Sequence, residues 1–458
     1  MKVYDLLLRA PRAILPTGED SVAVAVLDGR IVAIQPIDAE IRAHQTLTLS
    51  AEQVLLPGLV DSHVHICEPG NTEWEGFDYA TRAAAAGGIT TLVDMPLDSV
   101  PTTVTAEALK AKRNAATGKC YVDVGFWGGA VPSNLDDLAE LHSLGVLGFK
   151  SFLCETGTDD FPGISTDHML EVMRVTASLD SIFIVHAESA KAMARIKDVH
   201  TRSYAEYLAT RPRGIENLAI AEVVEAARAT GARAHILHLS SADALPMITS
   251  AIADGVRLSV ETCPHYLAIS AEQINDGETS AKVGPPIREE ANRARLWDGI
   301  AQGIIDTIVT DHSPCMPDMK EPITGDFSAA WGGIPSLELA LSVVWSEARS
   351  RGYSLGDVVR WMAESSAKVA GLAYKGRIAV GYDADFSVFD PDQSFVVDPA
   401  SFRQRHPVTP YAGRRLSGVV QETYLRGQRV FPFSKPSGRL ISRNDASIPV
   451  TNNSARND

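Results

Sequence analysis

The sequence predicts an α/β protein: a (β/α)8 TIM-like barrel with a smaller β-sandwich domain built from both ends of the chain. Three observations support this prediction. Eight apolar β segments alternate with helical stretches through the middle of the chain, which is the pattern of a parallel barrel. Short strands with turn signals occur at both ends, and neither end is long enough to form a stable sheet alone. The 458 residues, 45% of them hydrophobic, are sufficient for a large core and a second domain.

Both ends of the chain contain short predicted strands separated by turn signals. Near the N-terminus, Asp28-Gly29 between two apolar runs predicts a tight hairpin. Similar short strands are predicted over 374–397 and 418–432. We therefore expect residues 1–53 and 376–434 to form the β-sandwich domain and residues 54–375 to form the barrel. The last stretch, 435–458, is polar and poor in aromatic residues, which predicts a flexible tail.

The barrel strands are expected where apolar runs end in polar residues. A helix is expected over 72–88, where Gly87-Gly88 stops it, and further helices over 218–231 and 245–255. The expected strands cover 55–65, 89–96, 121–130, 146–153, 181–189, 232–241, 255–266 and 305–314. An active site in such a barrel lies at the C-terminal ends of its strands.

Charge and cysteine content limit the partners and the compartment. The formal net charge of -15 argues against nucleic acid or an anionic membrane surface as a partner. The apolar run near the N-terminus is interrupted by Arg9 and Arg12, too early for a signal peptide or a membrane span. Five cysteines without CxxC spacing do not form a disulfide framework in a chain of this length. We expect a cytoplasmic protein that acts on a small molecule.

Polar residues with metal-ligand chemistry end several of the predicted strands. Any one of them could be a capping or turn residue, but six at the mouth of one barrel indicate a metal centre. In "HILHLSS", His235 and His238 face opposite sides of the strand, and we choose His238 because it lies at the C-terminal end. The candidate ligands are His63, His65, Lys150, His186, His238 and Asp311.

Lys150 lies in the apolar stretch "GVLGFKSFL", where an unpaired charged lysine is rarely buried. A desolvated Schiff-base lysine is one explanation, but four histidines and an aspartate around it argue against that chemistry. The other explanation is reaction of the neutral amine with carbon dioxide, which gives an anionic carbamate (N6-carboxylysine) that can bridge two cations. Two divalent ions held in this way would share a hydroxide and lower the pKa of its parent water toward about 7.

The stretches "GLVDSHVH", "GFKSF", "VHAES", "HLSS", "TCPHY" and "TDHSP", in this order, resemble the binuclear cyclic amidohydrolases of the amidohydrolase superfamily. The resemblance covers about residues 1 to 435. It implies that His63, His65 and Asp311 hold one metal, that His186 and His238 hold the second, and that carboxylated Lys150 bridges them. It also implies that Asp311 is the catalytic proton shuttle and that the assembly is a homotetramer. Zinc is the first expectation for the metal, and cobalt, manganese, nickel or iron suit the same ligands.

Positions at which this sequence differs from the patterns of individual family groups narrow the choice of substrate. Dihydroorotases have an arginine where this chain has Cys67, and hydantoinases and dihydropyrimidinases have a tyrosine where it has Glu155. Stretches such as "ICEPGNTEWEG", "GPPIR", "DHSPC" and "AWGGIPSLE" resemble allantoinases. That resemblance implies hydrolysis of the ring amide of allantoin to allantoate through the shared hydroxide, a step of purine breakdown. It also implies ring recognition mainly by backbone groups, with Gly284 as a substrate-binding position.

Two other functions stay open at this point. One is a hydantoinase or dihydropyrimidinase activity on a related ring. The other is a non-catalytic scaffold like the collapsin-response mediators, which the complete set of ligand-type residues disfavours. Glu155 either contacts the ureido arm of the substrate or caps a turn. His265 and His312 are expected to pack locally or to support the ligands, and the polar loops 68–76 and 154–163 are candidate lids.

Overall fold

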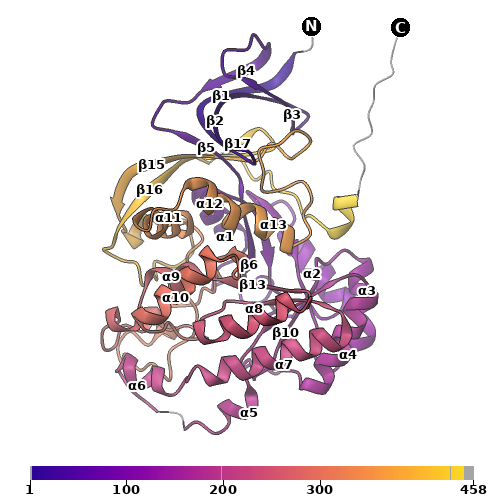
Figure 1. Cartoon of the computed structure of the whole chain (residues 1–458), viewed down its shortest axis with the longest axis vertical. Helices are drawn as coiled ribbons and strands as arrows, with labels where there is room; N and C mark the ends of the chain where they lie inside the picture. The colour runs from indigo at the N-terminus through magenta and orange to yellow at the C-terminus, as the bar shows by residue number, and fades with distance from the viewer. Residues whose placement is uncertain (1–2, 198, 434, 448–458) are drawn as a thin grey trace.

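The computed structural model describes residues 3–197, 199–433 and 435–447. Figure 1 shows a β-sheet region at the top of the view and a barrel with its covering helices below it. Indigo strands from the start of the chain lie beside orange and yellow strands from its C-terminal part (Figure 1). The fold class predicted from the sequence, a barrel with a β-sandwich domain, is confirmed.

The upper sheet joins strands from both ends of the chain in the order β17-β16-β15-β5-β1-β2-β3, with β4 paired to β1. These strands are β1 (Tyr4–Leu15), β2 (Gly18–Leu27), β3 (Arg30–Pro36), β4 (Ala43–Thr48), β5 (Val54–Pro57), β15 (Phe386–Val396), β16 (Arg415–Leu425) and β17 (Gln428–Phe431). The two ends meet where β15 pairs antiparallel with β5, with Phe386 opposite Pro57. The hairpin predicted at Asp28-Gly29 is present between β2 and β3, and both residues have positive φ there.

The barrel strands pair in parallel, as strands joined by helical crossovers do. They are β6 (Leu59–Val64), β7 (Ile89–Asp94), β8 (Asp123–Phe126), β9 (Gly128–Gly129), β10 (Phe149–Phe152), β11 (Ile182–His186), β12 (Arg233–Ile236), β13 (Leu258–Thr262) and β14 (Thr307–Ile308). One sheet runs β6-β7-β8 and another runs from β9 to β14 in sequence order. The strand predicted over 121–130 is thus divided into β8 and β9.

Hydrogen bonds between the segments that contain β14 and β6 connect the last barrel strand to the first. The N–H of His65 donates to the carbonyl of His312 at 2.8 Å, and Val64 forms a parallel bridge with His312. The buried carboxylate of Asp61 on β6 accepts from the N–H of Thr310 at 3.2 Å. These bonds hold the ends of the first and the eighth barrel strands together, which brings the polar residues that follow them to one place.

The helices pack their apolar faces on the barrel and on the sheet. Within the described residues they are α1 (Phe77–Ala86), α2 (Ala106–Ala116), α3 (Leu138–Ser143), α4 (Thr166–Ser178), α5 (Ala190–Met193), α6 (Tyr204–Ala209), α7 (Gly214–Thr230), α8 (Leu245–Ala253), α9 (Pro264–Ala268), α10 (Glu290–Ala301), α11 (Ala340–Ser350), α12 (Leu355–Val359) and α13 (Ser365–Val369). The helix predicted over 72–88 begins only at Phe77, because the preceding Gly76 has a non-helical backbone with φ 91° and ψ 157°. The Glu68 carboxylate accepts from the N–H of Phe77 at 2.9 Å. None of the described helices has the length and apolar character that crossing a membrane requires.

A buried cluster of charges connects the base of the barrel to the sheet. The ammonium of Lys375 lies 2.6 Å from carboxylate oxygens of Asp123 on β8 and of Asp385, and the guanidinium of Arg426 also contacts Asp123. The two aspartates raise the pKa of Lys375 against the opposing effect of its burial, so the lysine is charged. A buried ion pair is stable only when each charge is compensated in this way.

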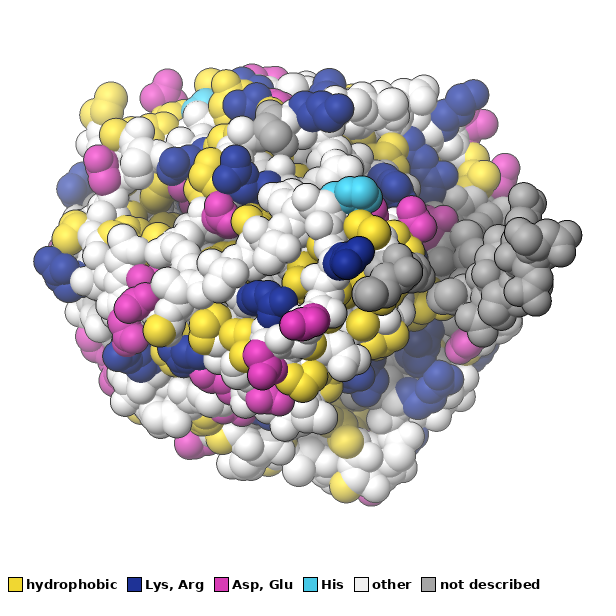
Figure 2. Space-filling model, turned by 90° about the horizontal axis from the view of Figure 1, so that it is seen from above, with side chains coloured by type: hydrophobic (Ala, Val, Ile, Leu, Met, Phe, Trp, Pro, Cys, Tyr) yellow, Lys and Arg dark blue, Asp and Glu magenta, His cyan; other side chains and the backbone are white. Residues whose placement is uncertain are grey.

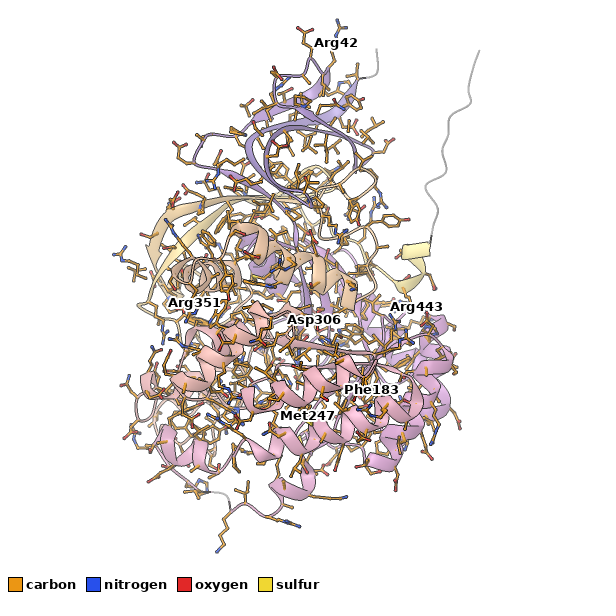
Figure 3. All side chains as sticks on the ribbon, in the orientation of Figure 1. Arg42, Phe183, Met247, Asp306, Arg351 and Arg443 are labelled. Carbon is orange, nitrogen blue, oxygen red and sulfur yellow. The ribbon has the colours of Figure 1, made fainter. Side chains whose placement is uncertain are left out.

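The segment after β17 returns to the barrel. The N–H of Gly438 donates to Cys120, and that of Ile441 donates to Val124 on β8, both at 2.9 Å. Figure 3 labels Arg443 where this segment meets the barrel. A flexible tail was expected from residue 435, but residues 438–441 pair with a barrel strand, because β8 leaves backbone groups free at that edge. Residues 448–458 of the expected tail lie outside the described residues.

Candidate metal centre

A cavity of about 560 Å³ opens at the C-terminal ends of the barrel strands. Residues in or after the strands β6, β10, β11, β12 and β14 line this cavity, so residues far apart in the sequence lie close together there. All six residues that the sequence singled out as metal ligands line this cavity and are buried: His63, His65, Lys150, His186, His238 and Asp311.

Asp311 lies at the centre of the histidines. Its Oδ1 atom is 3.1 Å from Nε2 of His63 and 3.6 Å from Nε2 of His65. The ring centroid of His238 is 5.4 Å from that of His63 and 4.5 Å from that of His186. The four imidazoles therefore form a continuous group around one carboxylate.

The backbone is strained at two of these residues. His238 has φ 35° and Asp311 has φ 48°, in the left-handed region that residues other than glycine adopt infrequently. Both residues lie shortly beyond a strand, His238 after Ile236 and Leu237, and Asp311 after Ile308 at the end of β14. The left-handed turn directs their side chains into the cavity. Strain of this kind is concentrated at functional sites, where the surrounding structure enforces it.

The ionisation of His186, His238 and Asp311 suits cation binding, whereas the carboxylates of Asp311 and Glu261 raise the pKa of His63 to about 9 against the opposing effect of its burial. Burial and the neighbouring Lys150 lower the pKa of His186 well below its usual range, and burial likewise lowers the pKa of His238. Neutral imidazoles offer the lone pair that a metal needs. Although burial opposes ionisation, the imidazoles of His63, His238 and His65 lower the pKa of Asp311, so its carboxylate is charged.

Lys150 is buried without a hydrogen-bond partner for its Nζ atom in the described part of the chain. Its Nζ lies 4.3 Å from the ring centroid of Phe152. Burial lowers the pKa of Lys150 to about 8, so a larger fraction of this amine is neutral near neutral pH than of an exposed lysine. An isolated buried ammonium is costly. The residue therefore fits the role of an amine that is modified or that contacts a ligand.

Glu261 on β13 orients two histidines and was not found from the sequence. Its Oε1 lies 2.5 Å from Nδ1 of His63, and its Oε2 lies 2.9 Å from Nε2 of His235. It also accepts from the backbone N–H of His238 at 3.1 Å. His235, which the sequence placed on the opposite side of its strand from His238, thus contributes through Glu261. The only sequence signal was a carboxylate in the apolar strand "LSVET".

Two further carboxylates contact the histidines from outside the group. Asp98 Oδ2 lies 2.7 Å from Nδ1 of His65, and Glu188 Oε2 lies 2.8 Å from Nε2 of His186. Metal-binding histidines commonly donate their second nitrogen to such a carboxylate, which fixes the ring and its tautomer. Neither residue was predicted from the sequence, because each lies in a loop whose path a sequence does not give.

His265 and His312 are buried beside the centre, as expected for supporting residues. Nδ1 of His312 accepts the N–H of Ser336 at 3.1 Å, and its Nε2 lies 3.8 Å from a carboxylate oxygen of Glu75. Neither ring nitrogen of His265 has a hydrogen-bond partner among the described residues. Both rings pack behind the ligands, outside the cavity lining.

The outer part of the cavity is formed by loops. Gly284 and Glu155 both belong to its lining, and Glu155 is exposed to solvent. Trp331 of the lining meets Trp74 edge to face, with 4.9 Å between ring centroids, so the loop 68–76 reaches the rim. Both loops predicted as candidate lids therefore border the opening.

Three groups of side chains within the described residues have the chemistry and proximity to hold a cation. His63, His65 and Asp311 form one, with their ligand atoms within 4.8 Å of one another. Cys154, His186 and Glu188 form another under the same limit. The third consists of acidic residues around Asp123, where Lys375 already supplies the positive charge.

The model of the amidohydrolase family matches residues 54–430. An allantoinase from Streptomyces avermitilis is 52% identical over 446 residues, which cover 97% of this chain and all of the relative. An allantoinase from Arabidopsis thaliana is 44% identical, over 93% of this chain and 88% of that protein. An allantoinase from Saccharomyces cerevisiae is 42% identical, over 92% of each.

Solved structures of similar fold include hydantoinases. The L-hydantoinase of Arthrobacter aurescens superposes with a TM-score of 0.89 at 30% identity, over 96% of this chain and 98% of that one. A D-hydantoinase superposes with a TM-score of 0.85 at 27% identity, over 95% and 98%. The similarity extends through both the barrel and the sheet region.

Proposed function

The chain belongs to the amidohydrolase family, and we propose that it acts as an allantoinase, a cyclic amidohydrolase that opens the hydantoin ring of allantoin to give allantoate. The observation that supports this most strongly is the 52% identity to an allantoinase over almost the whole chain. The histidine and aspartate group at the end of the barrel supplies the chemistry that such an enzyme needs.

We propose that the cavity holds two divalent ions. His63, His65 and Asp311 would hold one, and His186 and His238 the other. The buried, unpartnered Lys150 lies beside these histidines, which supports its conversion by carbon dioxide to a carbamate shared by both ions. Imidazole and carboxylate ligands suit zinc, our first choice, and also cobalt, manganese, nickel or iron. When bound, such ions polarise the substrate carbonyl and lower the pKa of the attacking water.

Asp311 is positioned to move the proton. Its carboxylate is ionised and lies among the imidazoles, 3.1 Å from Nε2 of His63. It accepts the proton of the water that attacks the ring carbonyl and then delivers it to the departing amide nitrogen. General acid–base catalysis of this kind depends first on geometry. The carboxylates of Glu261 and Asp98 keep the histidines oriented while this proton moves.

The residues of the outer cavity support allantoin as the substrate over an anionic ring such as dihydroorotate. Leu97 lines the cavity directly after "MP", and Cys67 stands where dihydroorotases carry an arginine two residues after the second histidine; the basic side chains of Arg211 and Lys282 reach the cavity from other segments. A Cβ atom added to Gly284 would meet nothing within 4 Å, so the space in front of its backbone is free for the ring. Glu155 borders the same space, where it can accept from the N–H groups of the ureido arm.

Three further properties are proposed with this function. A homotetramer is proposed because the family resemblance in the sequence implies it, and a cytoplasmic location because the five cysteines are free and buried rather than joined in disulfides. Acidic and basic side chains are interspersed on the face seen in Figure 2. The pairing of β15 with β5 supports a sandwich domain from residues 1–53 and 376–434 around a barrel of 54–375.

A substrate panel tests the assignment. The protein, reconstituted with zinc or cobalt, is assayed with allantoin, hydantoin, dihydrouracil and dihydroorotate. We expect allantoin to give the highest kcat/KM. A preference for hydantoin or dihydrouracil would support the hydantoinase alternative, and hydrolysis of none of the four by protein loaded with two metal equivalents would support a scaffold.

A further inference from the structure

A second potential metal group lies beside the proposed centre and shares one residue with it. Cys154, His186 and Glu188 are all buried, and all three line the cavity. Their ligand atoms lie within 4.8 Å of one another. Glu188 holds the ring of His186, but Cys154 has no part in the proposed hydrolysis, so a buried thiol in this cluster is left without an assigned use.

The backbone holds the three residues close together. β10 and β11 pair in parallel register, with Phe152 opposite His186. Beyond the strand ends, the N–H of Leu153 donates to the carbonyl of His186, and the N–H of Ala190 donates to the carbonyl of Leu153, both at 3.1 Å. The segments that carry Cys154 and Glu188 are therefore fixed against each other, as a binding site requires.

The donor set favours a soft divalent ion. A thiolate, an imidazole and a carboxylate are common zinc ligands, and three of them leave one tetrahedral position for water. Thiolate ligands select zinc and softer ions over magnesium or calcium. One thiolate and one carboxylate balance two positive charges, which matters because Arg211 also lines this side of the cavity.

We propose that Cys154, Glu188 and Nε2 of His186 form a third, inhibitory site that takes a soft divalent ion, such as zinc or cadmium, when it is in excess. On binding, the thiol of Cys154 releases its proton to solvent and the sulfur bonds to the ion. The inhibitory effect rests on the proposed function, because it requires His186 to serve the hydrolytic centre. The binding site itself does not depend on that function.

The inhibition follows from the single lone pair of a neutral imidazole. Nε2 of His186 lies 2.8 Å from Glu188, so this nitrogen faces the third site and Nδ1 is the other available donor. An ion bound to Nε2 transfers the ring proton to Nδ1. His186 can then no longer donate to a metal of the hydrolytic centre, so the excess ion weakens that centre.

The test titrates cadmium into protein that already carries two zinc equivalents, and follows the near-ultraviolet thiolate-to-cadmium absorption together with allantoin turnover. Cys154→Ala removes the sulfur, and Cys154→Ser is the alternative if the alanine variant folds poorly. Cys120→Ala is the matched control, because Cys120 is equally buried but lies outside the cavity. Turnover before cadmium addition reports on the proposed function separately.

We expect the absorption to rise as turnover falls in the wild type and in Cys120→Ala. In Cys154→Ala the absorption should be absent, and half-inhibition should need roughly tenfold more cadmium. Equal inhibition of Cys154→Ala and wild type would overturn the proposal, as would absorption that persists in Cys154→Ala or absorption without inhibition. If the starting protein hydrolyses no allantoin, the function fails, and the absorption alone still decides whether the site exists.

Discussion

Glu261 Oε1 lies 2.5 Å from Nδ1 of His63, with both side chains fully enclosed in the barrel. This contact joins β13 to β6 beneath the proposed metals. Because the same carboxylate also holds His235 and the backbone of His238, one residue controls the geometry of both halves of the centre.

Glu261→Gln should weaken the centre without unfolding the barrel. The amide keeps the shape of the side chain but cannot accept from both histidines as an anion, so metal affinity should fall about 10–100-fold. Metal content after dialysis against a buffered zinc series measures this. Glu225→Gln, on the exposed surface of α7, is the control and should bind like the wild type. Unchanged zinc affinity in Glu261→Gln would contradict the assigned role.

Lys150→Ala should lose the bridging group and most of the activity, on the order of a thousandfold. Short carboxylic acids added to the variant should restore part of the turnover, because they supply an anionic group in the vacated space. Metal analysis and allantoin turnover, with and without acetate or propionate, are the measurements. Full metal content and full turnover in Lys150→Ala would show that the residue bridges nothing.

Removal of the metals by a chelator should abolish turnover but leave the fold intact. The extended apolar core surrounds the barrel independently of the ligands, so circular dichroism should not change. The melting temperature should rise again as zinc or cobalt is restored, because an ion that binds only the native state stabilises it. Loss of secondary structure in the metal-free protein would mean that the ligands are needed for folding.

Lys375→Met should destabilise the protein while leaving the centre alone. It removes the ammonium that lies 2.6 Å from both Asp123 and Asp385 and leaves Arg426 as the remaining cation beside these buried carboxylates, so the free energy of unfolding should fall by about 3–5 kcal/mol. Denaturant unfolding measures the change. Lys368→Met, at an exposed position of α13, is the control, with an expected effect within about 0.5 kcal/mol.

Gly284→Ser should fold normally and change substrate choice. The added Cβ has no neighbour within 4 Å, so the substitution requires no repacking. The hydroxymethyl group narrows the cavity beside the substrate ring, and we expect kcat/KM for allantoin to fall roughly tenfold relative to hydantoin. Ratios of kcat/KM for the two substrates measure the effect, and an unchanged ratio would place the ring elsewhere in the cavity.

The sequence alone located the six ligand-type residues, because each lies within or shortly after an apolar strand and the ends of parallel strands must converge. It missed Glu261, Asp98 and Glu188. These carboxylates act on the ring nitrogens that face away from the centre, and their position depends on the path of the chain around the barrel. The same holds for the segment 438–441, whose polar composition predicted flexibility although its backbone pairs with β8.

The sequence thus determined the fold class from the periodicity of its strands and the residues that end its helices. It also determined which residues lie at the open end of the barrel, because the C-terminal ends of parallel barrel strands converge there. The tertiary structure decided which nitrogen of each histidine is held and by which carboxylate. It also decided that Cys154 and Glu188 meet beside His186. Such contacts join residues from separate loops within a few ångströms, and no local pattern encodes a distance of that kind.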